Sequence, residues 1–272
     1  TKVIADNEGT LHKFGGDMLM AFWNVMLPDP RAEINAIRAA LRLQSAVWSI
    51  NLGLAAEGQR PIHVGIGCNT GELAGGNIGG RDRMEYTVIG DNVNLGQRIE
   101  SLAGRWQVFT SQATFESARE LSSAVGLPLV CVKGRREPIK VYSIRGIRER
   151  NGRMLLAIPV AILTPDGNEG IAGMLTACEA PGTPEAAVEL VTGPEMVSWE
   201  NLVVKMELGE LEGALHLNAK VRNMERMMQE STRVQYTRLT LGDLAGDPAA
   251  RSLLCPGTLL ESNKSWERMK RA

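Results

Sequence analysis

An amide and a guanidinium stand four residues apart in a segment that could bind an anion. Residues 86–100 read YTVIGDNVNLGQRIE, which predicts a strand, a Gly-Asp turn and a helix carrying Asn94 and Arg98. Side chains at positions i and i+4 of a helix are neighbours, and free N–H groups in its first turns also favour negative charge. The pair therefore indicates an anion-stabilising site. Taken alone, the pair fits equally well the solvated face of an amphipathic helix. The buried face of that helix would carry Val93, Ile99 and Leu102.

The composition excludes several other kinds of protein. The chain has 272 residues, 44% of them hydrophobic, with a net charge of −1, so it lacks the basic character that binding to duplex nucleic acid requires. No apolar run approaches the length of a membrane span, and we expect a cytoplasmic protein. The cysteines and histidines are scattered without a CxxC pair, so we predict neither disulfides nor a zinc site. These residues are Cys68, Cys131, Cys178, Cys255, His12, His63 and His216.

The first third of the chain predicts short strands, turns at 7–9 and 15–17, and one long helix. Residues 2–5 and 11–14 are expected as strands, and Gly15-Gly16-Asp17 as a tight hairpin turn before the apolar run 18–23. The carboxylate of Asp17 at the hairpin tip can face a ligand. Apolar residues at helical spacing over residues 34–48 predict an amphipathic helix that ends near Gly58.

Two glycine patterns follow. Residues 62–68 alternate as in a strand, and the glycines on one face allow another element to pack closely. Residues 71–80, GELAGGNIGG, contain five glycines but lack the GK[ST] ending of a phosphate-binding loop. We therefore interpret them as a wide hairpin connection.

The next segments complete a pattern of alternating strands and helices. We predict a strand at 108–110, a helix over 111–125, and strands at 129–132 and 139–144 on either side of the basic turn 133–136. This order predicts an α+β sandwich, one sheet with helices on one face.

Three long motifs now allow a family to be named. KFGGDMLMAFW (13–23), IGCNTGELAGGNIGGRDRMEYTVIGDNVNLGQRIE (66–100) and VKGRREPIKVYSI (132–144) resemble, in order and spacing, the catalytic domain of class III adenylyl and guanylyl cyclases. The resemblance covers residues 1–147 and implies a ferredoxin-like α+β sandwich of the cyclase type. Such an enzyme forms a cyclic nucleotide by in-line attack of the ribose 3′-hydroxyl on the α-phosphate, while pyrophosphate leaves.

The resemblance implies roles for three residues in this displacement. Asp17 matches one of two metal-binding aspartates, which together hold two Mg²⁺ or Mn²⁺ ions per site. Asn94 matches the residue that orients the ribose, and Arg98 the residue that stabilises the α-phosphate. These residue types suit the reaction, because negative charge builds on phosphate oxygens that metals and an arginine can stabilise.

Four further residues match positions that contact the nucleotide. Lys13 and Thr87 match the two positions that read the purine, and lysine with threonine resembles an adenylyl branch of the family, so ATP is the implied substrate. Arg83 and Lys133 match basic positions near the triphosphate, although a solvated charge in a turn explains them nearly as well.

The sequence departs from the family pattern in two places. The other metal aspartate of the family lies on a strand that would precede Thr1, so we expect a fragment of a longer polypeptide that is close to inactive alone. Gly96-Gln97 replaces a more usual alanine and small or basic residue, and glycine inside a helix costs about 1 kcal/mol. Family sites form across a dimer interface, and this chain carries both kinds of site residue, so the resemblance implies a homodimer.

The composition changes after residue 147. Residues 148–153 are expected as a basic linker, and residues up to 193 are rich in proline and glycine. Strands at 155–163, 202–208, 214–221 and 233–240, with turns at 165–167, at 209 and over 224–230, predict a small β-barrel over 148–256. Residues 257–272 are expected as a loose polar tail.

The outline of this second region resembles a PilZ domain, which often binds cyclic di-GMP. The arginines at 148–153 miss the spacing of the family's ligand motif, and residues 168–173 (NEGIAG) have glycine where that motif has serine. A contact with protein is therefore at least as good an expectation as cyclic di-GMP binding.

Three functions fit this sequence. The first is an adenylate cyclase that makes cyclic AMP. The second is a catalytically silent nucleotide-binding or dimerisation domain, favoured if the native protein lacks the other metal aspartate. The third is a signalling adaptor whose barrel binds a cyclic dinucleotide or a partner protein.

Overall fold

The computed structural model describes residues 1–80, 83–163, 169–194, 200–211, 213–228, 234–262 and 264. The helices are α1 (Lys2–Ala5), α2 (Ala32–Ala56), α3 (Asp91–Glu100), α4 (Gln112–Ala118) and α5 (Pro248–Ser252), with a 3₁₀ turn at Arg119–Leu121. The strands of the first half are β1 (Thr10–Gly15), β2 (Met18–Phe22), β3 (Ile66–Cys68), β4 (Ala74–Gly80), β5 (Arg83–Ile89), β6 (Val108–Ser111), β7 (Ser122–Gly126) and β8 (Val141–Arg148). Those of the second half are β9 (Met154–Leu163), β10 (Glu169–Glu179), β11 (Ala187–Thr192), β12 (Asn201–Met206), β13 (Leu215–Met228), β14 (Gln235–Gly246) and β15 (Thr258–Glu261).

The sheet of the first half carries helices on both faces. Strands β3, β6 and β8 are neighbours in the order β3-β6-β8, and β8 also pairs with β7 and β9. Val108 packs in a core with residues of α2 and α4, whereas the next residue, Phe109, packs in another core with residues of α3. Successive strand residues point to opposite faces, so α3 covers the face opposite to α2 and α4. The expectation of helices on one face only is therefore wrong.

The N-terminal residues form a helix, not the predicted strand. Backbone N–H groups of Ala5 and Asp6 donate to the carbonyls of Thr1 and Lys2 at 3.2 and 2.9 Å, which closes one helical turn. The side chain of Ile4 is buried beneath it. The three apolar residues 3–5 fit a strand or a helix, and tertiary packing decided between them.

The predicted turn at Gly15-Gly16-Asp17 is confirmed. Strands β1 and β2 pair antiparallel, with Gly15 opposite Met18. Gly16 has φ +66°, a left-handed conformation that glycine adopts without strain, so the turn places Asp17 at the hairpin tip.

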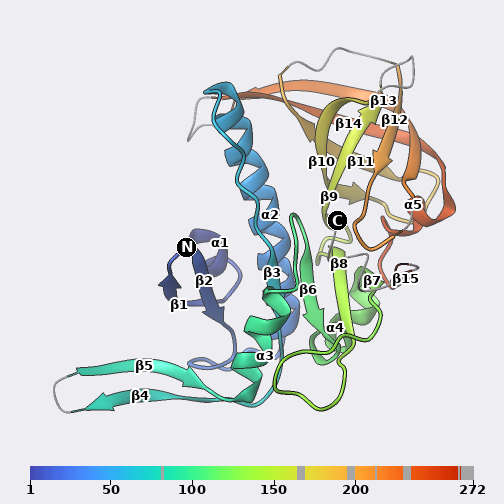
Figure 1. Ribbon diagram of the computed structural model, residues 1–272. Coiled ribbons are helices and arrows are strands. Elements are labelled where there is room, and N and C mark those ends of the chain that lie inside the picture. Colours follow the sequence, from blue (N-terminus) through green and yellow to red (C-terminus); the bar gives the residue numbers. More distant parts are fainter. Residues whose placement is uncertain are drawn as a thin grey trace.

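The glycine-rich segment forms a strand of its own. Strands β4 and β5 pair antiparallel from Ala74–Ile89 to Gly80–Arg83, so residues 74–80 are a strand and not a connection. This hairpin extends away from the rest of the molecule (Figure 1). The predicted strand at 62–68 is also shorter, because only Ile66–Cys68 pairs with β6.

The predicted helix over 111–125 ends early. Helix α4 stops at Ala118, and residues 122–126 form β7, which pairs with β8 on one side and with β15 on the other. Ala124 and Val125 are fully buried between these partners. The predicted strands on either side of the basic turn reduce to one bridge between Val130 and Ile139, and β8 begins at Val141.

The second half forms a six-stranded barrel, as predicted in outline. Hydrogen-bonded pairs close a ring in the order β9-β10-β11-β14-β13-β12 and back to β9. Its interior is apolar, with buried Ile158, Leu190, Val204, Leu217 and Leu239. The proline- and glycine-rich stretch contributes two strands, β10 and β11, and β13 continues to Met228, through much of the predicted turn over 224–230.

The barrel is joined to the first sheet without a break. The expected linker 148–153 is the tight turn between β8 and β9, in which the Glu149 amide donates to the Arg153 carbonyl at 2.7 Å. Residues 258–261 of the expected polar tail form β15, which runs parallel to β7. Residues 165–168, which include the predicted turn, and residues 265–272 lie outside the described part of the chain.

Among the described residues, no helix is both long enough and apolar enough to cross a membrane.

Candidate functional site

The backbone of helix α3 lies directly on strand β3. A Cβ atom on Gly67 would lie 2.2 Å from the backbone N of Glu100, and one on Gly65 would lie 2.5 Å from the backbone O of Ala103. Only glycine permits this approach, so the prediction that these glycines allow close packing is confirmed. The helix buries Leu95 and Ile99 and leaves Asn94 exposed.

The guanidinium of Arg98 is packed against the basic turn that precedes β8. A Cβ on Gly134, which has φ +77°, would lie 3.1 Å from Nη2 of Arg98. In the same turn, Nη2 of Arg135 donates to Oδ2 of Asp91 at 2.7 Å and ties the turn to the first residue of α3. The turn and the helix therefore form one unit around Arg98.

One nitrogen of Arg98 is buried and has no hydrogen-bond partner in the described part of the chain. This atom is Nη1, while the side chain as a whole is half-buried. A buried donor without a partner is unfavourable, and an anion oxygen would satisfy it and its charge together. Asn94 stands one helical turn earlier, so the amide and the guanidinium lie on one face of α3.

Thr87 on β5 contacts strand β1. Its Oγ1 lies 3.2 Å from Nε2 of His12, whose ring centroid lies 5.7 Å from that of Phe22. The pairing of β1 with β2 is irregular between Leu11 and Lys13, at His12. The structure thus brings Thr87 beside the strand that carries Lys13. No role was predicted for His12 from the sequence. Only its position next to Lys13 could have indicated that it lies near the site.

The remaining predicted residues are exposed or outside the described side chains. Asp17 and Lys133 are exposed in their turns, and Lys13 is exposed on β1. The backbone of Arg83 begins β5, but its side chain is not among those described. In the described ranges no hydrogen bond or ion pair joins Asp17 to Asn94 or Arg98. The structure therefore joins the helix to the basic turn, and Thr87 to β1, by direct contacts.

The described residues contain no group of three or more His, Cys, Asp or Glu side chains that could hold a metal ion. Burial raises the pKa of the Cys68 thiol on β3 to about 12, so this thiol stays protonated and offers no nucleophile.

Comparisons with known proteins give the family of the first half. Residues 5–146 match the family described as the adenylate and guanylate cyclase catalytic domain. Adenylate cyclase 1 of Rhizobium meliloti is 28% identical over 149 residues, covering 54% of this chain and 22% of the relative. The adenylate cyclase of Anabaena cylindrica is 31% identical over 154 residues, covering 53% of this chain and 30% of the relative. The chain thus spans less than a third of these curated relatives.

Two solved structures share the fold. The guanylyl cyclase Cya2 superposes with a TM-score of 0.51 at 32% identity, over 55% of this chain and 76% of that one. The adenylyl cyclase CyaB from P. aeruginosa gives a TM-score of 0.51 at 25% identity, over 56% of this chain and 78% of that one.

Proposed function

Because the chain belongs to the family of adenylate and guanylate cyclase catalytic domains, we propose that it acts as an adenylate cyclase, which converts ATP to 3′,5′-cyclic AMP and pyrophosphate in intracellular signalling. Two of its curated relatives are adenylate cyclases, whereas one solved relative is a guanylyl cyclase, so the choice of purine needs a direct test. The lysine and threonine at positions 13 and 87 favour ATP.

The observation that carries the proposal is the unpartnered Nη1 of Arg98. As the 3′-hydroxyl attacks the α-phosphate, negative charge grows on the phosphate oxygens, and a fixed guanidinium stabilises that charge. Packing against Gly134 holds the Arg98 head in place before substrate arrives. Asn94, one turn away, orients the ribose so that its hydroxyl lies in line with the leaving group.

Asp17 suits a role as a metal ligand. Its carboxylate is exposed at the tip of the β1–β2 hairpin, and Mg²⁺ is commonly held by one or two carboxylates together with substrate phosphates. When bound, Mg²⁺ or Mn²⁺, proposed as two ions per site, would neutralise the phosphates and assist ionisation of the hydroxyl.

The nucleotide contacts extend to four further side chains. Lys13 and Thr87 would read the purine. The contact with His12 holds the Thr87 hydroxyl next to β1, the strand that carries Lys13. Arg83 and Lys133 would contact the triphosphate.

We propose a homodimer of cytoplasmic location, with each site at the interface. The chain carries both Asp17 and Arg98, so two copies related by a two-fold axis could form two equivalent sites, each taking residues from both subunits. In this proposal residues 1–147 form the ferredoxin-like catalytic domain and residues 148–256 a PilZ-like domain, after which β15 returns to the sheet of the first half.

The test is turnover of the full-length protein with Mn²⁺ and either ATP or GTP, alongside Arg98→Ala. We expect cyclic AMP from ATP and a loss of about 10²-fold or more in kcat in the variant, the scale on which single transition-state donors act. Gln97→Ala is the matched control, because Gln97 is exposed on the same helix. Unchanged turnover in Arg98→Ala would remove the proposed role, and a preference for GTP would change the substrate.

A further inference from the structure

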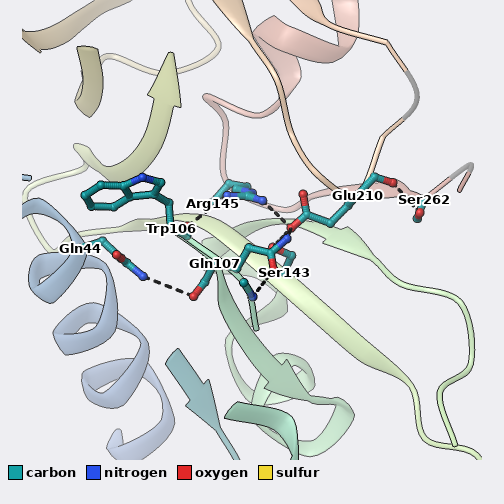
Figure 2. Close-up of polar contacts among 8 residues, drawn as sticks. Gln44, Trp106, Gln107, Ser143, Arg145, Glu210 and Ser262 are labelled. Atoms are coloured by element: carbon teal, nitrogen blue, oxygen red, sulfur yellow. Dashed lines mark hydrogen bonds and ion pairs between the residues drawn. The ribbon is translucent and has the colours of Figure 1, made fainter. Parts of the chain in front are cut away.

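A buried ion pair joins the barrel to the first sheet. Arg145 on β8 is 2% exposed and Glu210, which follows β12, is fully buried. Nη2 of Arg145 donates to Oε1 of Glu210, across 65 residues of sequence. Figure 2 shows these side chains pointing toward one another between the two parts of the molecule. Buried charges are unfavourable unless paired and hydrogen-bonded, so removing either side chain would leave the other charge buried alone.

The Glu210 carboxylate collects three donors on one oxygen. Besides Arg145, Oε1 accepts from Oγ of Ser143 at 2.6 Å and from Nε2 of Gln107 at 2.8 Å. Burial raises the pKa of this carboxyl, but the Arg145 charge and these hydrogen bonds outweigh burial and lower it below its ordinary value. The backbone O of Glu210 also accepts from Oγ of Ser262 at 2.5 Å, so the residue is held from both sides.

Gln107 links this carboxylate to the turn that follows α3. Its Oε1 accepts from the amide of Gly104 at 2.6 Å, so one side chain ties Glu210 to both ends of the turn 104–107. The backbone O of Gln107 accepts from the amide of Ile66 at 3.0 Å and from Nε2 of Gln44 at 3.3 Å. The same turn is therefore fixed to β3 and to α2 (Figure 2).

The turn carries a strained residue at its centre. Trp106 has φ +61°, a conformation that a bulky side chain rarely adopts. Nη1 of Arg145 donates to the Trp106 carbonyl at 3.4 Å, and the indole packs edge-on against Trp48 and His63 at 5.7 and 5.5 Å. Such strain persists only where the surroundings over-determine the conformation. Here the ion pair contributes to those surroundings.

We propose that Glu210 is a positioning residue for the nucleotide site, acting from the barrel through Gln107 on the helix that carries Asn94 and Arg98. The Ala103 amide donates to the Glu100 carbonyl at 2.8 Å, so the 104–107 turn follows directly on the C-terminal end of α3. A shift of the turn therefore shifts the helix end, two residues beyond Arg98. The inference rests on the proposed function for its effect on turnover, but not for its effect on the helix.

The ion pair could act in either of two ways, by stabilising the fold or by positioning α3. If the pair only stabilises the fold, then removing both charges together should be harmless, because apolar replacements of a buried pair are often neutral. If the ion pair positions α3, losing the Glu210 oxygen that accepts from Gln107 should lower kcat, even when both charges of the pair are removed together.

The test compares three variants of the full-length protein. Gln107→Leu breaks the link but keeps the ion pair, and Arg145→Met with Glu210→Leu removes the pair and the acceptor together. Asn51→Leu is the matched control, because Asn51 is another buried amide whose two hydrogen bonds, 2.7 and 2.8 Å, brace the backbone of Ile62 instead of the turn.

Two readouts are measured. We expect Gln107→Leu and the double variant to lower kcat with ATP by about tenfold, with KM within twofold, since small misplacements of catalytic groups act on the transition state. Amide hydrogen exchange over residues 97–104 should be at least about tenfold faster in both variants and unchanged in Asn51→Leu.

The outcomes are distinct. Unchanged exchange over residues 97–104 in Gln107→Leu overturns the proposal, whether or not the protein has cyclase activity. A double variant with unaltered kcat and exchange also overturns it and assigns the pair to stability alone. Faster exchange in a protein without any cyclase activity supports the positioning of α3 and refutes the proposed function instead.

Discussion

The contact between α3 and β3 can be tested by adding a single methyl group. In Gly67→Ala the new Cβ would lie 2.2 Å from the Glu100 N and 2.5 Å from its Cα, whereas ordinary van der Waals contact begins at 3.4 Å. The obstacle is backbone, which cannot rotate away as a side chain would. The helix end must therefore move by about 1.2 Å, the difference between the first and the last of these distances.

This displacement predicts a large loss of activity and a moderate loss of stability. A misplacement of about 1 Å can cost about 10²-fold in rate, so we expect kcat with ATP and Mn²⁺ to fall by about that factor. Over-filling a packed contact costs about 1–3 kcal/mol in the free energy of unfolding. Urea unfolding measures the second quantity and cyclic AMP formation the first.

The control adds the same methyl group within the helix itself. A Cβ on Gly96 would meet only the Cβ of Asn69, at 3.5 Å, so Gly96→Ala should fit and should stabilise the helix by up to about 1 kcal/mol. We expect its kcat to stay within a few-fold of the unaltered protein. Equal kcat in Gly67→Ala and the unaltered protein would refute the reasoning that the packing of α3 sets the position of Arg98.

Two further predictions follow from burial and charge. Because the pKa of Glu210 is lowered in the folded protein, its contribution to stability is present above the ordinary carboxyl pKa of about 4.3 and is lost as the pH falls through the folded-state value. The free energy of unfolding should therefore fall more steeply between neutral pH and about pH 3 in the unaltered protein than in Glu210→Gln, and parallel curves would contradict this. For the thiols, Cys131 is exposed, whereas Cys178 is buried and burial raises its pKa to about 12. A maleimide at neutral pH should modify Cys131 in the folded protein and Cys178 only after unfolding, and mass spectrometry of native Cys178 adducts would show otherwise.

The sequence predicted the features that depend on local chemistry. Gly16 marked the hairpin turn, and its positive φ explains why. Apolar residues at helical spacing located α2, and the glycines at 65 and 67 indicated close packing of another element, which proved to be α3. These patterns fix backbone conformation or one buried face, and neighbours in sequence suffice to determine both.

Errors arose where distant partners decide the structure. Residues 122–126 continue the helical pattern of α4, but their burial between β8 and β15 makes a strand, and β15 comes more than 130 residues later in the chain. Residues 2–5 show the reverse error, since a buried Ile4 favours a helical turn over a strand.

The candidate site was predictable as a set of residue types and not as a geometry. The motif around Asn94 and Arg98 indicated the chemistry, and the roles of these residues, of Asp17 and of Thr87 stay predictions. The support of Arg98 by Gly134, and of α3 by Glu210, depends on chain segments that no local pattern connects.

The parallel pairing of β15 with β7 has a consequence for how the protein is made. Thr258 lies opposite Ser123, so the β7 edge of the first sheet stays open while the whole barrel is synthesised. The barrel strands pair largely with neighbours in the chain, as in β9–β10 and β13–β14, and can close before that edge is covered. During synthesis the sheet of residues 1–147 therefore gains its last strand only after the residues of the barrel have been made.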